Sequence, residues 1–445
     1  MPTTDPAAGF AASDFAAEPR VTLDDAELQT IAVLGLGYVG LPTALALHAA
    51  GLTVVGIDIS EARLAVVRMG RPDLLDSDLA RLDVAREDGQ RFVLTDDLGA
   101  LESADCVLIC VPTPIDARQN PDLEPLRAAC ATVVEHARPG QAFVLTSTTY
   151  VGCTRDMLVK PLAERGLIAG SDVYVCFAPE RIDPANTTFA QTAVPKVAGG
   201  VTPACVAAVK PILETISANI HVVSSPEAAE LTKLLENTFR AVNITLANEV
   251  AEAAGALGLD PVEVIDAAAT KPYGFMPFYP GPGVGGHCIP CDPHYLLWQL
   301  RDERMYPAVI SAAMQGIATR TTRIVQRAAE VLDLHGRALR GAAVLVVGAA
   351  YKPNVADSRE SPALEIISRL RCRGALVALY DPLIGGVRID GELLLSLDEL
   401  PDMRDYDLVV VACRHDITPP EAFAGAKVVL DTTYRLPAAS NRFVP

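Results

Sequence analysis

A cysteine within a loop rich in glycine and proline is the first candidate for chemistry. Cys288 lies in the segment GPGVGGHCIPCDP, in which five glycines and prolines precede His287. An irregular backbone of this kind can approach a ligand closely, and a thiol among backbone amides can have a lowered pKa and act as a nucleophile. Most other cysteines, such as Cys106 and Cys110 in CVLICV, lie in apolar runs and are expected to be buried. We therefore single out Cys288, with Asp292 four residues later.

A lysine and an asparagine lie four residues apart in the longest helical pattern of the chain. The segment AAELTKLLENTFRAVNITLANEVAEAAGALG contains no proline, and its helix is expected to end at Gly258. Lys233 and Asn237 share one face of this helix. Taken alone, such a pair is typical of a solvated helix face, so a role in a site depends on the residues around it.

Polar residues follow three of the apolar runs that we expect to be strands. Thr113 follows CVLICV, Ser147 and Thr148 follow FVLT, and Glu180 and Arg181 follow VYVCFAP. Ligands of open α/β sheets bind at the carboxyl ends of the strands, so these three endings indicate one shared cleft. For Ser147 or Thr148, a helix N-cap is the simpler alternative.

A glycine motif near the N-terminus predicts a dinucleotide site. In IAVLGLGYVGLP, Gly35, Gly37 and Gly40 have GxGxxG spacing between an apolar strand and a helical stretch. The first glycine permits a tight turn, the second lets the backbone approach a pyrophosphate at the helix N-terminus, and the third lets helix and strand pack closely. Asp58 ends the next strand, where it can accept hydrogen bonds from a ribose diol and repel a 2′-phosphate. NAD is therefore favoured over NADP, although Arg63 lies one helical turn beyond that strand.

These candidates need elements to position them, and the pattern of the chain predicts which elements those are. Short Val/Ile/Leu runs alternate with helical stretches from residue 30, give way to helices from about residue 226, and return near Gly341. Continuous apolar strands separated by helices predict a parallel sheet covered on both faces. We therefore expect an α/β fold over 445 residues. Its parts are a mobile acidic tail at 1–29, an α/β domain at 30–222, a helical domain with one long helix at 223–330, and a second α/β domain at 331–445, which could be a distant version of the first.

Charge and composition exclude several classes of function. The chain has 55 Asp plus Glu against 37 Lys plus Arg, and this net charge of −18 argues against binding to nucleic acid or to an anionic membrane. Residues 31–57 carry no Asp, Glu, Lys or Arg, but their glycines and proline divide them into strand, turn, helix and strand, unlike a membrane span. No secretory signal is visible, and cysteines in apolar runs suit a reducing compartment. We expect a cytoplasmic protein.

Several segments together resemble the UDP-glucose/GDP-mannose dehydrogenase family. In family order they are GLGYVGLP, VPTP, the STT strand end, APERI, ELTKLLENTFRAVNI, GPGVGGHCIPCDP and YKPNVADSRESPA, and they cover nearly all of residues 30–440. The resemblance implies an N-terminal Rossmann domain that binds NAD, a central helical domain that forms a homodimer, and a C-terminal Rossmann-like domain that binds a nucleotide-diphosphate sugar. It also implies oxidation of the sugar C6 alcohol to a carboxylate with two molecules of NAD.

The family motifs imply roles for individual residues of the central domain. Cys288 matches the family nucleophile, and Lys233 matches the lysine that steadies a developing oxyanion, with Asn237 beside it. Asp292 matches the aspartate that works with that lysine and a water.

The motifs of the two α/β domains imply further roles. Glu180 matches the glutamate tied to thioester hydrolysis, and Thr148 matches the threonine that helps to hold its water. Lys352 and Arg359 match the lysine and arginine that face the nucleotide sugar and the domain interface. The complete set of expected site residues comprises, for catalysis, Cys288, Lys233, Asp292, Asn237, Glu180 and Thr148; for the cofactor, Gly35, Gly37, Tyr38, Val39, Gly40, Asp58, Arg63, Thr113, Thr148 and Arg359; and for the substrate, Glu180, Arg181, Lys233, Asn237, Tyr279, Gly285 and Lys352.

The implied chemistry suits these residue types. Loss of the first hydride gives an aldehyde, and the alkoxide before it needs a cation or donor such as Lys233 and Asn237. Oxidation of an aldehyde needs a tetrahedral adduct first, which Cys288 can supply as a thiohemiacetal. Loss of the second hydride leaves a thioester, which water hydrolyses with base assistance. Two NADH would form in each turnover.

Two features leave the sugar and the base of the substrate open. The loop KPYGFMPFYPGPGVGGHCIP is most similar to that of family members acting on UDP-N-acetylglucosamine. The composition, rich in alanine and arginine, resembles that of a high-GC actinobacterium, in which related enzymes serve antibiotic sugar pathways on UDP- or TDP-glucose.

One residue departs from the family pattern. Cys291 stands where an aliphatic residue is expected, and with His287 and His294 it completes the pattern H-C-x-x-C-x-x-H. Structural zinc sites usually pair two separate segments, so we predict no metal here. A reversible Cys288–Cys291 disulfide and a passive Cys291 are the two alternatives.

Two other functions are weighed against the four-electron dehydrogenase. A two-electron NAD-dependent hydroxy-acid dehydrogenase would use Lys233 and Asn237 without the cysteine, but the complete second α/β unit disfavours it. A non-catalytic NAD-binding regulatory protein would need neither the cysteine loop nor the lysine helix, and both are intact.

Overall fold

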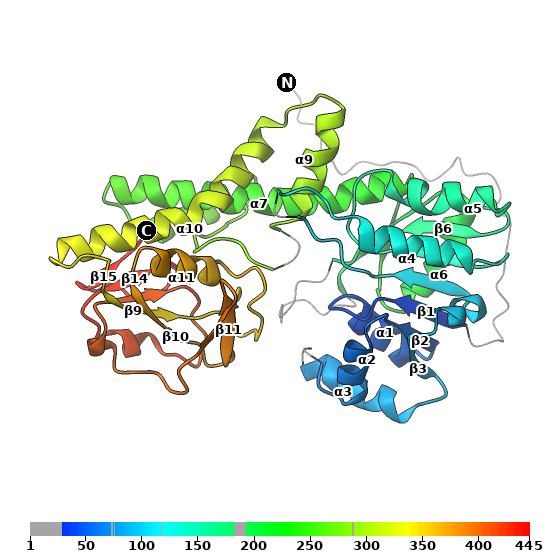
Figure 1. The fold of residues 1–445 in the computed structure, drawn as a ribbon. Coiled ribbons are helices and arrows are strands. Elements are labelled where there is room, and N and C mark those ends of the chain that lie inside the picture. Colours follow the sequence, from blue (N-terminus) through cyan, green and yellow to red (C-terminus); the bar gives the residue numbers. More distant parts are fainter. Residues whose placement is uncertain (1–28, 73, 75, 117, 182–192, 287–288) are drawn as a thin grey trace, which may run out of the picture.

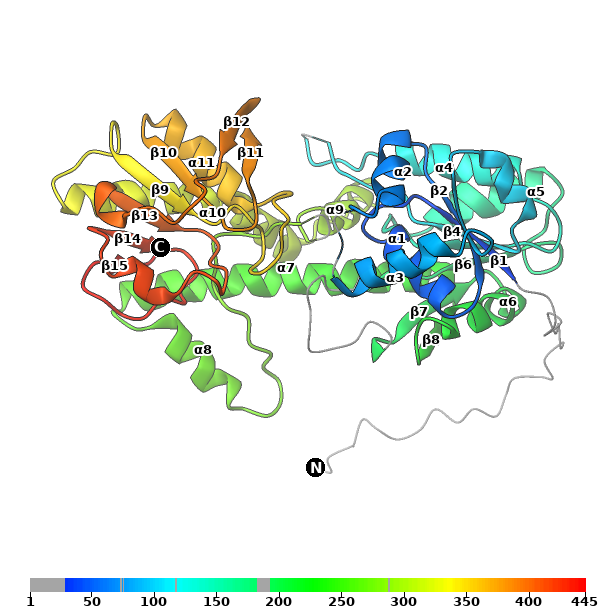
Figure 2. The same cartoon turned by 90° about the horizontal axis from the view of Figure 1, so that it is seen from below.

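Two parallel sheets and a central set of helices make up the molecule. The computed structural model describes residues 29–72, 74, 76–116, 118–181, 193–286 and 289–445. The long helix α7 (Pro226–Ala256) runs from one α/β part to the other, as Figures 1 and 2 show. The expected α/β class, with parallel sheets and a helical central region, is confirmed. The expected tail at 1–29 lies, except for its last residue, outside the described residues.

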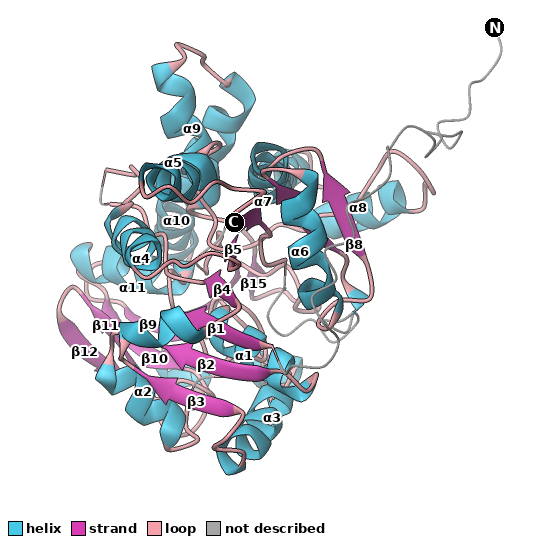
Figure 3. Ribbon diagram, turned by 90° about the vertical axis from the view of Figure 1, so that its right-hand side faces the viewer, coloured by secondary structure: helices cyan, strands magenta, loops and turns pink. Residues whose placement is uncertain are grey.

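The first sheet has eight strands in the order β3-β2-β1-β4-β5-β6-β7-β8. Figure 3 shows β1, β2 and β3 side by side at one edge. Among the described strands of this sheet, β6 and β7 form the one antiparallel pair, and the other neighbours are parallel. The strands are β1 (Thr30–Leu34), β2 (Thr53–Ile57), β3 (Phe92–Thr95), β4 (Cys106–Ile109), β5 (Ala142–Leu145), β6 (Tyr174–Phe177), β7 (Lys196–Gly200) and β8 (Ile220–Val223).

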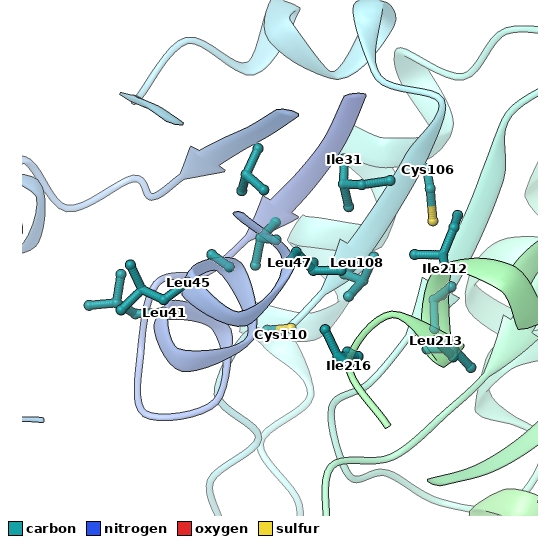
Figure 4. Packing of buried hydrophobic residues seen from close by; sticks show 14 of the residues in the cluster. Ile31, Leu41, Leu45, Leu47, Cys106, Leu108, Cys110, Ile212, Leu213 and Ile216 are labelled. Carbon is teal, nitrogen blue, oxygen red and sulfur yellow. The ribbon is translucent and has the colours of Figure 1, made fainter. Parts of the chain in front are cut away.

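Helices cover both faces of this sheet, which is why its inner strands are continuous apolar runs. Successive side chains of a strand point to opposite faces, so Ile31 packs into one core and Ala32 into the other. Figure 4 shows the first core, in which Leu45 of α1 and Ile212 of α6 face the sheet. The helical elements of this part are α1 (Gly40–Ala49), α2 (Glu61–Arg68), α3 (Asp76–Glu87), η1 (Leu98–Ser103), α4 (Glu124–Glu135), η2 (Arg155–Val159, a π-helical turn), α5 (Lys160–Glu164) and α6 (Pro203–Glu214).

The central helices follow directly after β8. Helix α7 ends at Ala256, and Gly258 then adopts a φ of 73°, so the expected helix end is correct within two residues. The other helices are α8 (Pro261–Ala269), α9 (Asp292–Asp302) and α10 (Ala308–Leu334). Both α9 and α10 pack against α7. No helix in the described part of the chain is both long and apolar enough to cross a membrane.

The second sheet has five parallel strands in the order β10-β9-β13-β14-β15. Its elements are β9 (Ala343–Val347), α11 (Pro362–Cys372), β10 (Leu376–Tyr380), β13 (Leu408–Val411), β14 (Val429–Asp431) and β15 (Arg442–Phe443). An antiparallel hairpin of β11 (Gly386–Ile389) and β12 (Glu392–Leu395) and two short 3-10 turns, η4 (Met403–Asp405) and η5 (Pro420–Phe423), lie between them in the chain.

The two α/β parts share the same turn after their first strand. Gly35 and Gly348 have φ values of 92° and 91°, and each donates its amide at 2.8 Å to the last carbonyl of the neighbouring strand. In each part, the amide after the glycine donates to the aspartate that follows the neighbouring strand, to Asp58 at 2.8 Å and to Asp381 at 2.7 Å. This correspondence supports the expectation that the two parts are distant versions of one unit.

Candidate functional site

The glycine loop between β1 and α1 has the geometry of a phosphate-binding turn. A Cβ atom on Gly40 would lie 1.8 Å from the carbonyl oxygen of Gly35, so close packing of helix and strand requires glycine there. A Cβ atom on Gly37 would meet no protein atom within 4 Å, so packing does not explain this glycine. Room beside the N-terminus of α1 is what a pyrophosphate needs, and the loop therefore fits NAD.

Asp58 and Arg63 both hold the glycine loop. The carboxylate of Asp58 accepts the amide of Leu36 at 2.8 Å on one oxygen and the amide of Ser60 at 2.9 Å on the other. Nε of Arg63 donates to the carbonyl oxygen of Leu36 at 2.7 Å. Each carboxylate oxygen can accept more than one hydrogen bond, so Asp58 keeps the capacity to bind a ribose diol.

We predict that Asp58→Asn raises the KM for NAD about tenfold, because hydrogen bonds to a charged acceptor contribute about 1.5 kcal/mol or more. The KM for NADP should fall or stay constant, because the amide no longer repels a 2′-phosphate. Asparagine keeps an acceptor for the amide of Leu36, so the loop stays supported. Initial rates with the two cofactors measure the effect. A wild-type protein that uses NADP as well as NAD would contradict the role of Asp58.

The second α/β unit does not repeat this ribose site. Asp381, its counterpart of Asp58, accepts four backbone amides and Nε2 of His415 at 3.2 Å. Both side chains are almost completely buried. A carboxylate offers about four lone pairs, so Asp381 has no acceptor left for a ribose.

Arg359 joins the second unit to the glycine loop. Its guanidinium carbon lies 3.5 Å from the centroid of the Tyr38 ring. Tyr38 stands between Gly37 and Val39 in the glycine motif. Asp357 holds this guanidinium through bonds of 2.9 Å to Nε and 2.6 Å to Nη2. The role of Arg359 toward the cofactor stays a prediction.

The same segment also contacts the cysteine loop. The amide of Gly286 donates to the carbonyl oxygen of Arg359 at 3.2 Å. A Cβ atom on Gly285 would lie 2.6 Å from Cβ of Tyr351, the residue before Lys352. Gly285 is thus needed for the packing of the loop on the second unit, which brings Lys352 near the loop. Cys288 and His287 lie outside the described residues.

Four of the expected catalytic residues come together along α7, which packs against both β6 and α9. Nζ of Lys233 donates to the carbonyl oxygen of Glu180 at 2.8 Å, and Nδ2 of Asn237 donates to Oδ2 of Asp292. Lys233 and Asp292 are only 7% and 3% exposed. The alternative of a solvated face for Lys233 and Asn237 is therefore wrong. Burial raises the pKa of Asp292 to about 6, although the charge of Lys233 and the bond from Asn237 oppose this rise.

A lysine that the sequence did not single out holds Glu180. Nζ of Lys196, at the start of β7, lies 2.7 Å from Oε2 of Glu180, and both side chains are nearly buried. The amide of Arg181 donates to the other carboxylate oxygen at 2.8 Å. Arg181 itself forms an ion pair with Glu236 of α7. A lysine within the apolar run VPKVAGG was the one sequence signal for this pair.

The polar residues at the ends of β4 and β5 lie side by side, because these strands are neighbours. Oγ of Ser147 donates to the carbonyl oxygen of Val111 at 2.7 Å, so Ser147 ties the two strand ends together and is not a helix cap. Thr113 and Thr148 are half-buried at the same edge. Tyr295 of α9 reaches the carbonyl oxygen of Pro114 at 3.4 Å, which joins this edge to the central helices.

Tyr279 and Cys291 lie outside the cluster of Lys233, Asn237, Asp292 and Glu180. The hydroxyl of Tyr279 donates to Asp266 of α8 at 2.7 Å, and its role toward a substrate stays a prediction. Cys291 is buried at the N-cap of α9. Within the described ranges, no group of three His, Cys, Asp or Glu side chains is arranged to hold a metal.

Comparison with known proteins gives a consistent relationship. Models of three domains of the UDP-glucose/GDP-mannose dehydrogenase family match the chain: the NAD binding domain at 29–217, the central domain at 227–316 and the UDP binding domain at 345–435. A UDP-N-acetyl-D-glucosamine 6-dehydrogenase of Pseudomonas aeruginosa is 34% identical over 388 residues, which cover 86% of this chain and 90% of the relative.

Two solved structures share the fold over almost their whole length. The UDP-D-ManNAc dehydrogenase from Pyrococcus horikoshii has a TM-score of 0.83 and 30% identity, and the match covers 94% of this chain and 98% of that one. A UDP-glucose dehydrogenase from Pyrobaculum islandicum has a TM-score of 0.82 and 26% identity, with 96% and 98% covered.

Proposed function

Because the chain belongs to the UDP-glucose/GDP-mannose dehydrogenase family of NAD-dependent nucleotide-sugar dehydrogenases, we propose that it oxidises the C6 hydroxymethyl group of a nucleotide-diphosphate hexose to the uronic acid. The observation that carries this proposal is the cluster of Lys233, Asn237, Asp292 and Glu180, in which Lys233 and Asp292 are buried. Four-electron oxidation needs an oxyanion donor, a nucleophile and a base in one place. This cluster brings together a donor and two carboxyl groups, and Cys288 precedes Asp292 of the cluster by four residues in the chain.

When bound, NAD would supply the hydride acceptor, with one molecule for each of the two oxidations and exchange of NADH for NAD between them. Gly37 and the N-terminus of α1 would hold its pyrophosphate, Asp58 its ribose, and Arg359 would add a positive charge beside them. In the first oxidation, the C6 hydroxyl passes its proton through a water to the carboxylate of Asp292, and the ammonium of Lys233 stabilises the alkoxide that forms. One of its three N–H groups is used by the carbonyl of Glu180, which leaves donors for the substrate oxygen.

The second oxidation depends on the cysteine. Addition of the Cys288 thiolate to the aldehyde forms a C–S bond and an oxyanion, which Lys233 and Asn237 stabilise. Hydride loss from this thiohemiacetal leaves a thioester. Water then adds to the thioester carbonyl, its proton passes to a carboxylate, and the thiolate leaves. Asp292 and Glu180 are the nearby carboxyl groups, and Thr148 lies at the neighbouring strand end.

We expect turnover to depend on the ionisation of Asp292. Its pKa of about 6 means that the carboxylate is charged at pH 7.5 and takes up a proton as the pH falls through 6. If the carboxylate accepts the proton of water, kcat should fall about tenfold for each pH unit below 6. Asp292→Asn should lower kcat at pH 7.5 about a hundredfold and remove this limb of the profile.

Thermal unfolding separates this effect from a loss of structure. The folded protein holds the proton of Asp292 more tightly than the unfolded chain does, because the pKa is raised from 3.8 to about 6. The ionised carboxylate therefore destabilises the fold above pH 6, and this effect disappears as the pH falls below 3.8. Asp292→Asn should keep or raise the Tm at pH 7.5. A lower Tm together with an unchanged pH profile would assign Asp292 to packing.

The substrate is proposed to be a UDP-hexose, since the three relatives described above are named for UDP sugars. Their names give three different sugars, so a panel of UDP-glucose, UDP-N-acetylglucosamine, UDP-N-acetylmannosamine and TDP-glucose is needed. The decisive measurement is the number of NADH per molecule of product. Two NADH for each uronic acid would support the proposal. One NADH and no uronic acid with every member would overturn it in favour of a two-electron dehydrogenase.

A homodimer through the central helices is part of the proposal. Helix α7 exposes a row of large apolar side chains on one face, namely Leu231, Leu235, Phe239 and Leu246. A row of this kind is typical of a helix that packs against another chain. The twofold partner is proposed to be a second copy of the same chain.

A further inference from the structure

The segment that follows Thr148 is held by two side chains from the central helices. Residues 149–154 lead from the end of β5 into the π-helical turn η2. Glu230 of α7 and Gln299 of α9 bond to the backbone of this segment. Neither side chain has been given a role in the chemistry so far.

Glu230 receives three hydrogen bonds at the start of the helical turn. Its carboxylate accepts the amide of Gly152 at 2.5 Å, the amide of Thr154 at 2.9 Å and the hydroxyl of Thr154 at 2.6 Å. The Glu230 side chain is fully buried. The first amides of a helix have no partner within the helix, and a carboxylate there satisfies them and favours the helix dipole. Glu230 therefore fixes the backbone on the C-terminal side of Thr148.

Gln299 forms a pair of hydrogen bonds with the backbone of one residue in the same segment, as a neighbouring strand would. Its Oε1 accepts the amide of Val151 at 2.9 Å, and its Nε2 donates to the carbonyl oxygen of Val151 at 2.7 Å. On the near side, Ser147 is tied to Val111 at 2.7 Å. Thr148 thus lies between two fixed points of the backbone.

Helix periodicity connects Glu230 and Gln299, which we call the clamps of this segment, to the candidate site. Glu230 precedes Lys233 by three residues, which is about one turn of α7. Gln299 follows Asp292 by seven residues, which is about two turns of α9. Each clamp therefore shares a helix face with a proposed catalytic group. A shift of either helix would move the clamp and the catalytic group together.

We propose that Glu230 and Gln299 are positioning residues that set Thr148 in register with Lys233 and Asp292. Their effect falls on hydrolysis of the thioester, because Thr148 is assigned to the hydrolytic water. Hydride transfer depends mainly on Lys233 and on the glycine loop, which bond to neither Glu230 nor Gln299, so the part of Thr148 in holding the cofactor is expected to be the smaller one. This inference rests on the proposed function and adds to it a control of one step by residues that contact no substrate.

Gln299→Ala removes both bonds to Val151 and tests this inference. With the UDP sugar that the panel identifies as substrate, rapid mixing should give a burst of two NADH per site at a rate within threefold of wild type. Steady-state turnover should fall tenfold or more, because small displacements of a positioned group cost this much in rate. Intact-mass measurement should show the uronyl thioester accumulating. Gln326→Ala, at an exposed glutamine of α10 that bonds to Glu330, is the matched control.

Glu230→Gln is the second variant, because glutamine replaces one acceptor oxygen by a donor that opposes the amide of Gly152 or Thr154. It should slow the same step, and Glu249→Gln, on an exposed position of the same helix, should not. An unchanged steady state in Gln299→Ala overturns the inference. Equal slowing of the burst and of the steady state also overturns it, because hydride transfer would then depend on Gln299 as much as hydrolysis does. A wild-type protein that yields one NADH and no uronic acid overturns the proposed function itself.

Discussion

Cys288→Ala should stop the formation of uronic acid, with a loss of roughly a thousandfold or more, as expected when a nucleophile that acts as part of a unit is removed. Without sulfur, the aldehyde cannot form a thiohemiacetal, and no thioester follows. Removal of the first hydride needs no sulfur, so exchange between alcohol and aldehyde should survive at a reduced rate. Chromatography of the product together with NADH absorbance measures both reactions.

Two related variants sharpen this result. Cys288→Ser should be slow, because a serine adduct gives an ester that hydrolyses sluggishly and should be visible as an acyl-enzyme by mass. Cys291→Ser should keep near-full turnover under reducing conditions, because no chemical step is assigned to that buried thiol. A Cys288→Ala protein that makes uronic acid at the wild-type rate would remove the cysteine from the mechanism.

The parallel strands were predictable because they are buried on both faces and therefore form continuous apolar runs. Such runs predicted the strands β1, β2, β4, β5 and β6. Strand β8, with the sequence IHVV, contains a histidine and two exposed positions, so it is no continuous apolar run. Strand β3 has the apolar sequence FVLT, but only its first residue is buried. The antiparallel pairing of β7 with β6 depends on tertiary packing and has no local signal.

The parts of the candidate site were predictable to different degrees, and the difference lies in how far apart their partners are in the chain. Gly35, Gly37 and Asp58 belong to one local unit whose spacing carries the prediction. The role of Lys233 needed the family resemblance, because helix periodicity alone does not distinguish a buried face from a solvated one. The burial of Lys233 then settles that question in the structure.

The residues that the sequence missed act through distant partners. Lys196, at the start of β7, pairs at 2.7 Å with Glu180, which follows β6 and lies 16 residues earlier in the chain. Glu230 reaches Thr154 from 76 residues away, and Gln299 reaches Val151 from 148 residues away. A single sequence has no pattern that marks such pairs. Buried charged or amide side chains on helices that also carry candidate catalytic groups are the places to look for them.

Lys233→Ala should lower kcat about a hundredfold or more, the cost of removing one oxyanion donor. The KM for the nucleotide sugar should change much less, because the charge is needed most when the C6 oxyanion develops. A second consequence follows from the electrostatic effect of Lys233 on Asp292. The charge of Lys233 lowers the pKa of that carboxyl, so its removal should move the acid limb of the pH profile upward from about 6.

The matched control for this variant is Lys210→Ala, since Lys210 lies on the exposed side of α6 beside Glu214 and should leave kcat and the pH profile unchanged. Lys233→Arg keeps the positive charge but not the geometry of an ammonium in a buried site. Compared with Lys233→Ala, it should return the acid limb of the pH profile to about 6, but it should not restore kcat. That combination would separate the electrostatic effect of Lys233 on Asp292 from its contact with the oxyanion. A Lys233→Ala protein within threefold of the wild-type kcat, with the limb still at pH 6, would leave Lys233 only its structural bond to the carbonyl of Glu180.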